Sequence, residues 1–254
     1  MVMHNRDGQS NLLSKCEKND LSAVILAGGL GTRLRSMVND RPKVMAEIQG
    51  RPFIEWLIIS LRQGGIHRIL LSIGYLGQSI VDYFQDGQAW GVSIDYSLEP
   101  ASLGTGGALR HCLPLLSEDP VLVLNGDSYC GVNFQNYLAW FGARDRMGAL
   151  VLARVPQSSR FGQVEITDQG EIACFQEKGS MTQSPWINAG VYLFSPRLLQ
   201  TIPDGKPVSL EREILPNWVG RGLWGYPCSG EFVDLGTPEG YQETQKLFST
   251  LSFP

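Results

Sequence analysis

The fold is decided by the stretch Leu21-Ser22-Ala23-Val24-Ile25-Leu26-Ala27-Gly28-Gly29-Leu30-Gly31-Thr32-Arg33-Leu34. Its first six residues form a short apolar run, which is typical of a buried parallel strand. The glycines that follow allow backbone N–H groups to approach an anion closely, because no Cβ stands in the way. We therefore predict a strand that leads directly into an anion-binding loop.

The spacing within this loop excludes two familiar nucleotide-binding motifs. Leu34 stands where the dinucleotide fingerprint requires Gly or Ala, and no Gly-Lys-Ser/Thr sequence follows as in a Walker loop. Arg33 can offer a bidentate fork to phosphate oxygens, and Lys43, ten residues later, adds a compact positive charge. These donors suit a triphosphate. The alternative is a glycine-rich turn that joins a strand to a helix, with both cations in solvent.

Apolar periodicity along the chain predicts alternating strands and helices. Pro52 begins a helix whose apolar face runs from Phe53 to Leu61 and stops at Gly64-Gly65. Further strands are expected at 68–73, 92–96 and 121–124, and further helices at 78–84 and 107–116. This alternation indicates an α/β, Rossmann-like fold, with a mainly parallel sheet flanked by helices.

The pattern changes after about Ala149. Strands at 151–155, 163–166 and 171–176, with a turn at Asp168-Gln169-Gly170, predict a smaller, partly antiparallel portion. A brief strand is expected at Phe232-Val233, and Thr237-Pro238-Glu239 has the N-cap, first-turn proline and first-turn acid of a last helix. We expect one domain over 21–254, preceded by a flexible polar extension at 1–20.

Bulk composition limits the classes of partner. The net charge of -4 argues against nucleic acid or an anionic membrane as a partner, although it permits a local cluster of cations around a phosphorylated ligand. No apolar run is long enough to span a bilayer and no leader-like segment precedes the first strand, so we expect a cytoplasmic protein. The five cysteines are scattered without a Cys-x-x-Cys pair, which argues against a disulfide framework or a structural zinc site.

Two aspartates stand directly beyond predicted strands. Asp127 ends the sequence Leu124-Asn125-Gly126-Asp127, and Asp234 follows Phe232-Val233. Two carboxylates can hold one Mg²⁺ whose remaining ligands come from substrate phosphates and water. The alternative is that each aspartate only caps a turn.

A set of motifs in a fixed order resembles the sugar-1-phosphate nucleotidyltransferases from Leu21 to about Leu247. The motifs are Leu26-Ala27-Gly28-Gly29-Leu30-Gly31-Thr32-Arg33-Leu34, Arg41-Pro42-Lys43, Leu103-Gly104-Thr105-Gly106-Gly107-Ala108, Asn125-Gly126-Asp127, Glu177-Lys178, Asn188-Ala189-Gly190-Val191 and Asp234-Leu235-Gly236-Thr237-Pro238-Glu239. The resemblance implies a nucleotide-binding half at 21–148 and a sugar-binding half at 149–254. It also implies a nucleoside triphosphate and a sugar 1-phosphate as substrates, and Mg²⁺ as cofactor. It leaves self-association of the chain open.

The resemblance assigns roles to individual residues. The nucleotide would be held by Leu26, Ala27, Gly28, Gly29, Gly31, Thr32, Arg33, Lys43, Glu99, Gly104 and Thr105. The sugar phosphate would be held by Gly126, Gly162, Glu165, Lys178, Asn188 and Gly190. Asp127 and Asp234 would bind the metal, and Arg33, Lys43 and Asp127 would be catalytic. The family's Glu-Lys-Pro appears here as Glu177-Lys178-Gly179, which constrains the backbone at Lys178 less. Glu165 and Asn188 retain an alternative as a hairpin charge and a turn residue.

The base and the sugar are indicated by fewer residues. Glu99 lies where relatives read the base, and a carboxylate can accept both the N1–H and N2–H₂ donors of guanine. Segments around Glu99, Trp186-Ile187-Asn188 and Ser209-Leu210-Glu211 resemble D-glycero-α-D-manno-heptose 1-phosphate guanylyltransferases, which form GDP-heptose and pyrophosphate from GTP. Mannose 1-phosphate guanylyltransferases, and uridylyl- or thymidylyltransferases acting on hexose 1-phosphates, are the alternatives within the family. A non-catalytic nucleotide-sugar sensor is the alternative outside it.

Overall fold

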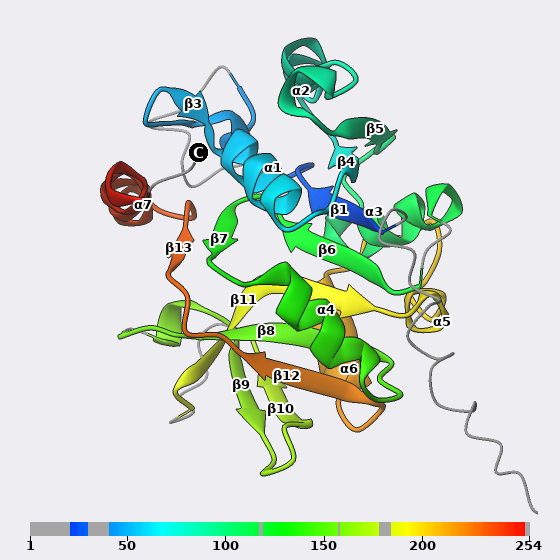
Figure 1. Ribbon diagram of the computed structural model, residues 1–254. Coiled ribbons are helices and arrows are strands. Elements are labelled where there is room, and N and C mark those ends of the chain that lie inside the picture. Colours follow the sequence, from blue (N-terminus) through cyan, green and yellow to red (C-terminus); the bar gives the residue numbers. More distant parts are fainter. Residues whose placement is uncertain (1–20, 30–40, 117–118, 157, 178–183, 252–254) are drawn as a thin grey trace, which may run out of the picture.

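A nine-stranded mixed sheet runs through this computed structural model, which describes residues 21–29, 41–116, 119–156, 158–177 and 184–251 (Figure 1). The strands are β1 (Ser22–Leu26), β2 (Glu47–Ile48), β3 (Arg51–Pro52), β4 (Arg68–Ile73), β5 (Ser93–Leu98), β6 (Val121–Asn125), β7 (Ser128–Cys130), β8 (Gly148–Arg154), β9 (Gln163–Ile166), β10 (Ile172–Gln176), β11 (Trp186–Phe194), β12 (Leu223–Pro227) and β13 (Phe232–Asp234). The main path across the sheet is β10-β9-β11-β6-β1-β4-β5, and β8 lies beside β11 and β12.

The first half of the sheet is parallel, as the alternating pattern predicted. β1 lies between β4 and β6 and pairs with both in parallel, and β4 pairs in parallel with β5. Parallel strands place their carboxyl ends at one edge, so the segments after β1, β4, β5 and β6 leave the sheet together. The mainly parallel α/β sheet is confirmed.

The second half is partly antiparallel, also as predicted. β11 pairs antiparallel with β6 and β8 on its two edges, and β9 of the β9–β10 hairpin pairs antiparallel with Trp186 and Ile187 at the start of β11. The hairpin turns at Gly170, whose φ of +89° lies in the left-handed region that glycine adopts without strain. The predicted strand at 151–155 is β8, which begins earlier, at Gly148, and pairs with β12 in parallel.

Helices cover both faces of the sheet. They are α1 (Phe53–Gln63), α2 (Gln78–Phe84), α3 (Gly104–Cys112), α4 (Phe134–Gly142), α5 (Pro196–Leu199), α6 (Leu215–Trp218) and α7 (Pro238–Thr250). One buried cluster joins α1, α2, α4 and α7 to the face that carries Ala23 and Ile25. The other joins α3, α5 and α6 to the face that carries Val24. Alternate residues of β1 thus enter opposite cores, because successive side chains of a strand point to opposite faces.

The helix expected at 107–116 is shifted in the structure. α3 already begins at Gly104 and ends at Cys112, where a 3-10 turn, Leu113–Leu115, follows. Glycine makes the early start possible, because a Cβ on Gly104 would stand 2.6 Å from the Val208 carbonyl oxygen. That carbonyl accepts hydrogen bonds from the backbone N–H groups of Gly106 and Gly107 at 3.0 and 3.2 Å. The prediction of a loop at 104–106 was therefore wrong, because the first turn of α3 lies there.

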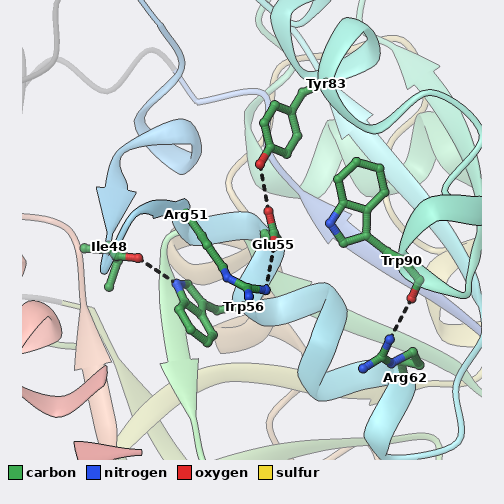
Figure 2. A network of polar contacts seen from close by, with 7 residues as sticks. All are labelled: Ile48, Arg51, Glu55, Trp56, Arg62, Tyr83 and Trp90. Carbon is green, nitrogen blue, oxygen red and sulfur yellow. Dashed lines mark hydrogen bonds and ion pairs between the residues drawn. The ribbon is translucent and has the colours of Figure 1, made fainter. Parts of the chain in front are cut away.

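A polar network ties α1 to α2 and to the β2–β3 hairpin (Figure 2). The Glu55 carboxylate, 6% exposed, accepts from Arg51 at 3.0 Å and from the Tyr83 hydroxyl at 2.9 Å. Beside it, the Trp56 indole N–H donates to the Ile48 carbonyl at 3.0 Å. The buried carboxylate is therefore paired from two directions, as a buried charge must be.

A membrane-spanning helix is not found among the described residues, since none of their helices combines the necessary length and apolar character.

Candidate active site

A cavity of about 450 Å³ opens where β1 and β6 end and where the two halves of the sheet meet. This volume is in the range of small-molecule sites. Its lining comprises Leu26, Ala27, Gly28, Gly29, Lys43, Val44, Glu99, Ser102, Gly104, Thr105, Ala108, Asn125, Asp127, Ser128, Phe161, Gly162, Glu177, Asn188, Gly190, Ser209, Glu211, Arg212, Phe232, Asp234 and Gly236. Most of the predicted site residues thus share one cavity.

The start of the glycine-rich loop forms one wall of this cavity. The Ala27 N–H donates to the Ser72 carbonyl at 2.8 Å, which continues the β1–β4 ladder one residue beyond β1. Gly28 follows, and a Cβ there would stand 2.0 Å from the Glu99 carboxylate. Glycine is therefore needed at position 28 for the backbone and Glu99 to lie together. Gly31, Thr32 and Arg33 lie outside the described residues.

Lys43 and Asp127 form an ion pair in the cavity. The Lys43 Nζ lies 2.8 Å from the Asp127 Oδ2, and the side chains are 13% and 40% exposed, respectively. Lys43 opens a 3-10 turn, Lys43–Met45, directly after Pro42, while Asp127 follows β6. An aspartate that only caps a turn does not need a lysine as partner. The ion pair with Lys43 therefore favours a charged binding site over a turn cap.

Asp234 lies beside Asp127 on a short ladder of its own. β13 pairs antiparallel with β7, which puts Asp234 opposite Ser128, and the Leu235 N–H donates to the Asp127 carbonyl at 2.8 Å. The Asp234 Oδ1 accepts from the Gly236 N–H at 2.7 Å, which fixes the carboxylate. These two carboxylates, one in the turn between β6 and β7 and already paired with Lys43 and the other at the end of β13, fit the oxygen ligands that Mg²⁺ prefers. Within the described ranges, no cluster of three or more His, Cys, Asp or Glu side chains forms a metal site, so further ligands would come from substrate or water.

Glu99 lines the cavity beside Gly28 and the loop that leads into α3. Its Oε2 accepts from the Leu103 N–H at 3.1 Å, which holds the carboxylate against the loop that leads into α3. Burial raises the pKa of the Glu99 carboxyl above its ordinary value, and the hydrogen bond from Leu103 partly opposes the shift. A half-buried carboxylate held over Gly28 is a fixed hydrogen-bond acceptor in the cavity.

Two amide side chains that line the cavity, Asn125 and Asn188, surround the buried Tyr192. The Asn188 Nδ2 donates to the Tyr192 hydroxyl at 2.8 Å, and its Oδ1 accepts from the Gly190 N–H at 3.1 Å. Gly190 has a φ of +73°, and a Cβ there would stand 2.5 Å from the Ser128 hydroxyl oxygen. The Asn125 Nδ2 contacts the same Tyr192 hydroxyl at 3.4 Å, while its buried Oδ1 has no hydrogen-bond partner among the described residues. The Asn125 Oδ1 is therefore an unsatisfied buried acceptor next to Tyr192.

Comparison with known proteins identifies the family. The family model described as Nucleotidyl transferase matches residues 22–250. The chain belongs to that family. A D-glycero-alpha-D-manno-heptose 1-phosphate guanylyltransferase from Aneurinibacillus thermoaerophilus is 33% identical over 227 residues, covering 89% of this chain and 97% of the relative. A mannose-1-phosphate guanylyltransferase from Mycobacterium tuberculosis is 33% identical over 226 residues, covering 88% of this chain and 63% of the relative.

A solved structure shows the same fold. HddC from Yersinia pseudotuberculosis, complexed with GMP-PN, superposes with a TM-score of 0.78 at 31% identity, covering 90% of this chain and 99% of that chain. The fold of this nucleotidyltransferase is therefore that of its family, and the predicted Rossmann-like architecture is confirmed. Together with the named relatives, the family match identifies the chain as a sugar-1-phosphate nucleotidyltransferase.

The structure does not bring two of the expected sugar-phosphate residues of this nucleotidyltransferase to the cavity. Glu165 is exposed in β9, three residues beyond Gly162. Because a strand advances about 3.3 Å per residue, Glu165 lies roughly 10 Å along the strand from that glycine. The Gly126 N–H instead donates to the Leu26 carbonyl at 2.9 Å, and a Cβ there would stand 2.6 Å from the same oxygen. Gly126 thus joins two segments behind the cavity wall, and neither residue is among those that line it.

Two acids that carried no predicted role line the cavity of this nucleotidyltransferase. Glu177 lies against Gly162, whose Cβ would stand 3.1 Å from the Glu177 Oε2, so it occupies the place expected for Glu165. Glu211 accepts from the Thr105 hydroxyl at 2.6 Å, in a π-helical turn, Leu210–Ile214, that packs beside α3. Both acids belong to motifs that carry the family resemblance, Glu177-Lys178 and Ser209-Leu210-Glu211, but the resemblance gave neither acid a role. Lys178, next to Glu177, lies outside the described residues.

Proposed function

We propose that this enzyme transfers a guanylyl group from GTP to D-glycero-α-D-manno-heptose 1-phosphate, giving GDP-heptose and pyrophosphate. The observation that carries the choice of base is Glu99, whose carboxylate is held at the nucleotide end by Leu103. Guanine offers two adjacent donors, N1–H and N2–H₂, to such an acceptor. The 33% identity with a heptose relative, covering 97% of that relative, supports the choice of sugar.

The chemistry needs charge neutralisation more than proton transfer. A sugar phosphate has a second pKa of about 6, so its oxygen is already largely a dianionic nucleophile at neutral pH. The protein must bring two polyanions together and hold them in line. Lys43 contributes one cation from inside the cavity, and Arg33 and Lys178 are proposed to contribute two more from the adjoining loops. His67 and His111 are absent from the cavity lining, which agrees with a reaction that needs no general base.

Asp127 and Asp234 would hold Mg²⁺, which when bound supplies positive charge to the phosphates of both substrates. Before the metal arrives, Lys43 neutralises Asp127 at 2.8 Å. Lys43 would share or release this carboxylate when a metal is held there, and the triphosphate would offer the ammonium a new partner. Lys43 would thereby link the charge of the Asp127 carboxylate to binding of the triphosphate.

The sugar hydroxyls are assigned to the amide network and to Glu177. Asn125 contacts the Tyr192 hydroxyl, and Asn188 is fixed by Tyr192 and Gly190, so both amides are oriented before the sugar binds. Glu177 adds a carboxylate acceptor at the same end. An acceptor-rich surface suits a polyol such as a heptose, which carries more hydroxyl donors than a hexose.

The in-line step has a stereochemical test. Attack by the sugar phosphate on the α-phosphorus without a covalent enzyme intermediate inverts that centre. GTP with a chiral thio-substituted α-phosphate should therefore give GDP-heptose of inverted configuration. Retention would indicate two displacements and contradict the direct attack.

The substrate choice is tested by incubating the enzyme with GTP, heptose 1-phosphate and Mg²⁺ and following ³¹P signals. The proposal expects GDP-heptose and pyrophosphate in equal amounts. Turnover only with mannose 1-phosphate, or only with UTP or dTTP, would favour the hexose alternatives. Magnesium-dependent binding of GDP-heptose without any turnover would favour a sensor.

A further inference from the structure

Two of the scattered cysteines meet in the fold. Cys130 ends β7 and is 4% exposed, while Cys228 directly follows β12 and is partly exposed. Their chain segments adjoin, although 98 positions separate the two cysteines in sequence (228 minus 130): the Cys228 sulfur lies 3.9 Å from the carbonyl oxygen of Gly131, the residue directly after Cys130. Neither thiol lines the active-site cavity, so the pair has no part in the proposed reaction.

The backbone around the pair holds both thiols in place. The Gly131 N–H donates to the Glu231 carbonyl at 2.9 Å, and the Gly131 carbonyl accepts from the Cys228 thiol at 3.9 Å. A Cβ on Gly230 would stand 2.2 Å from that carbonyl oxygen, so the two segments touch through glycines. The Gly230 N–H donates to the Cys228 sulfur at 3.3 Å. These contacts hold the two cysteines in adjoining segments of the chain.

The same contacts make the two thiols chemically different. The hydrogen bond from Cys130 lowers the pKa of Cys228 to about 6, assisted by the Gly230 N–H and opposed by burial. That contact and burial raise the pKa of Cys130. Tyr129 and Tyr226 are titratable neighbours, and burial first and then the nearby thiols raise the pKa of each, so both stay neutral. The directions of these shifts, together with the greater exposure of Cys228, favour Cys228 over the buried Cys130 as the nucleophile.

We propose that Cys228 and Cys130 form a modification site for hydroperoxides, at which Cys228 is oxidised first and Cys130 closes a reversible disulfide. The Cys228 sulfur attacks one peroxide oxygen, the O–O bond breaks, and an alcohol or water leaves after taking up a proton. Cys130 then attacks the resulting sulfenic acid, and its thiol proton leaves with the hydroxyl as water. The two sulfurs together lose two electrons, which reduce the peroxide.

The position of the pair gives the modification a route to the active site. Cys130 pairs with Phe232 on the short β7–β13 ladder, whose other end pairs Ser128 with Asp234. A disulfide at Cys130 therefore constrains the same ladder that presents Asp234 to the cavity. The proposed oxidation of Cys130 and Cys228 does not depend on any effect on Asp234, because it is detected as a change in the mass of the protein.

The test treats the full-length enzyme with limiting hydrogen peroxide and maps its peptides. We expect a loss of two hydrogen masses, one cross-linked peptide joining Cys130 to Cys228, and full reversal by dithiothreitol. Cys228→Ser should form no cross-link. Cys130→Ser should stop at a sulfenic acid on Cys228, which a cyclic dione traps. Cys174→Ser, at a partly exposed thiol on β10, is the matched control and should cross-link like the wild type.

A second readout needs no variant. The rate of alkylation at Cys228 should rise with pH and reach half of its maximum near pH 6, whereas an ordinary thiol does so near 8.5. Oxidation that falls on Cys112 or Cys174 as readily as on the pair, or an alkylation midpoint above pH 8 at Cys228, would overturn the proposal.

Discussion

In the proposed reaction, Lys43 and Asp127 are the residues on which the chemistry depends most directly. Their ion pair measures 2.8 Å and puts a positive charge at the place where two phosphate chains must meet. Removal of one such preorganised group typically costs about 10²- to 10³-fold in turnover. Lys43→Met should therefore lower kcat/KM for both substrates by about this factor, while Lys43→Arg should recover part of it.

The measurement is steady-state pyrophosphate release, with urea unfolding of each variant as the control for folding. Lys43 is only 13% exposed but is paired through a partly exposed carboxylate, so its loss should alter the unfolding midpoint little. A Lys43→Met enzyme with unchanged kcat/KM would remove Lys43 from the mechanism.

Glu99 is the residue that we expect to choose the base. A hydrogen bond to a charged group contributes about 1.5–3 kcal/mol, so Glu99→Gln should weaken GTP binding roughly ten- to hundredfold. Binding of UTP should change much less, because an amide suits its mixed donors and acceptors. Glu171→Gln, at the β9–β10 hairpin away from the cavity, is the matched control. Equal losses for GTP and UTP would contradict a role in base choice.

The raised pKa of Glu99 adds a pH dependence. Burial favours the neutral acid, so the carboxylate protonates at a higher pH than an ordinary glutamate. The acceptor pair for guanine is complete above this pKa and is lost as the pH falls through it. The ratio of GTP to UTP affinity, in which phosphate ionisation cancels, should thus decrease in mild acid. An identical decrease of this affinity ratio in the Glu99→Gln variant would show that a group other than Glu99 causes the pH dependence.

Residue positions were predictable where a motif ties a side chain to a strand end. Asp127 and Asp234 could be placed because each stands at or just beyond the end of a short strand, and both line the cavity. Glu165 and Gly126 could not, because sequence spacing says nothing about how far a strand runs from the cavity. Glu177 was overlooked since it sits at the end of a hairpin strand, where its proximity to Gly162 depends on pairing across β9 and β10.

At the scale of elements, the network on α1 should contribute to stability without touching activity. Glu55 is 6% exposed and depends on Arg51 and Tyr83 (Figure 2). Arg51→Met leaves a buried carboxylate with one partner fewer, at a cost of about 1–3 kcal/mol. The double variant Arg51→Met/Glu55→Leu should regain much of that loss, because no buried charge remains to be paired.

Urea unfolding of the single and double variants completes this cycle. None of the network residues lines the cavity, so kcat/KM should be unchanged throughout. A double variant less stable than Arg51→Met alone would show that the carboxylate contributes more through Tyr83 than through Arg51.

Elements with a strong local signal were predictable from sequence, and those defined by tertiary contacts were not. α2 and β4 fall where apolar periodicity placed them. α3 begins three residues earlier than predicted because Gly104 and Gly106 pack on the Val208 carbonyl, a contact from a distant segment. The pairing of β11 with β6 joins the two halves, and it could not be predicted because no local pattern specifies which strands pair.

At the scale of the whole molecule, substrate binding should stabilise the fold. A ligand at a hundred times its Kd adds about 2.7 kcal/mol, which corresponds to a rise in Tm of roughly 5–10 °C for a chain of this size. GTP with Mg²⁺ should therefore raise Tm more than GTP alone. Asp234→Asn should lose the magnesium-dependent part, whereas Asp168→Asn, on an exposed turn, should keep it. A magnesium-dependent shift that survives in Asp234→Asn would move the metal site elsewhere.

The proposed function requires one cavity to select guanine at its nucleotide end and heptose at its sugar end. One competition assay tests both at once, because products formed from mixed substrates report ratios of kcat/KM directly. Equal concentrations of GTP, ATP, UTP and dTTP are incubated with equal heptose, mannose and glucose 1-phosphates, and the nucleotide sugars are identified by mass. The account predicts GDP-heptose as the dominant product. Dominance of GDP-mannose, or of any uridine or thymidine sugar, would contradict it.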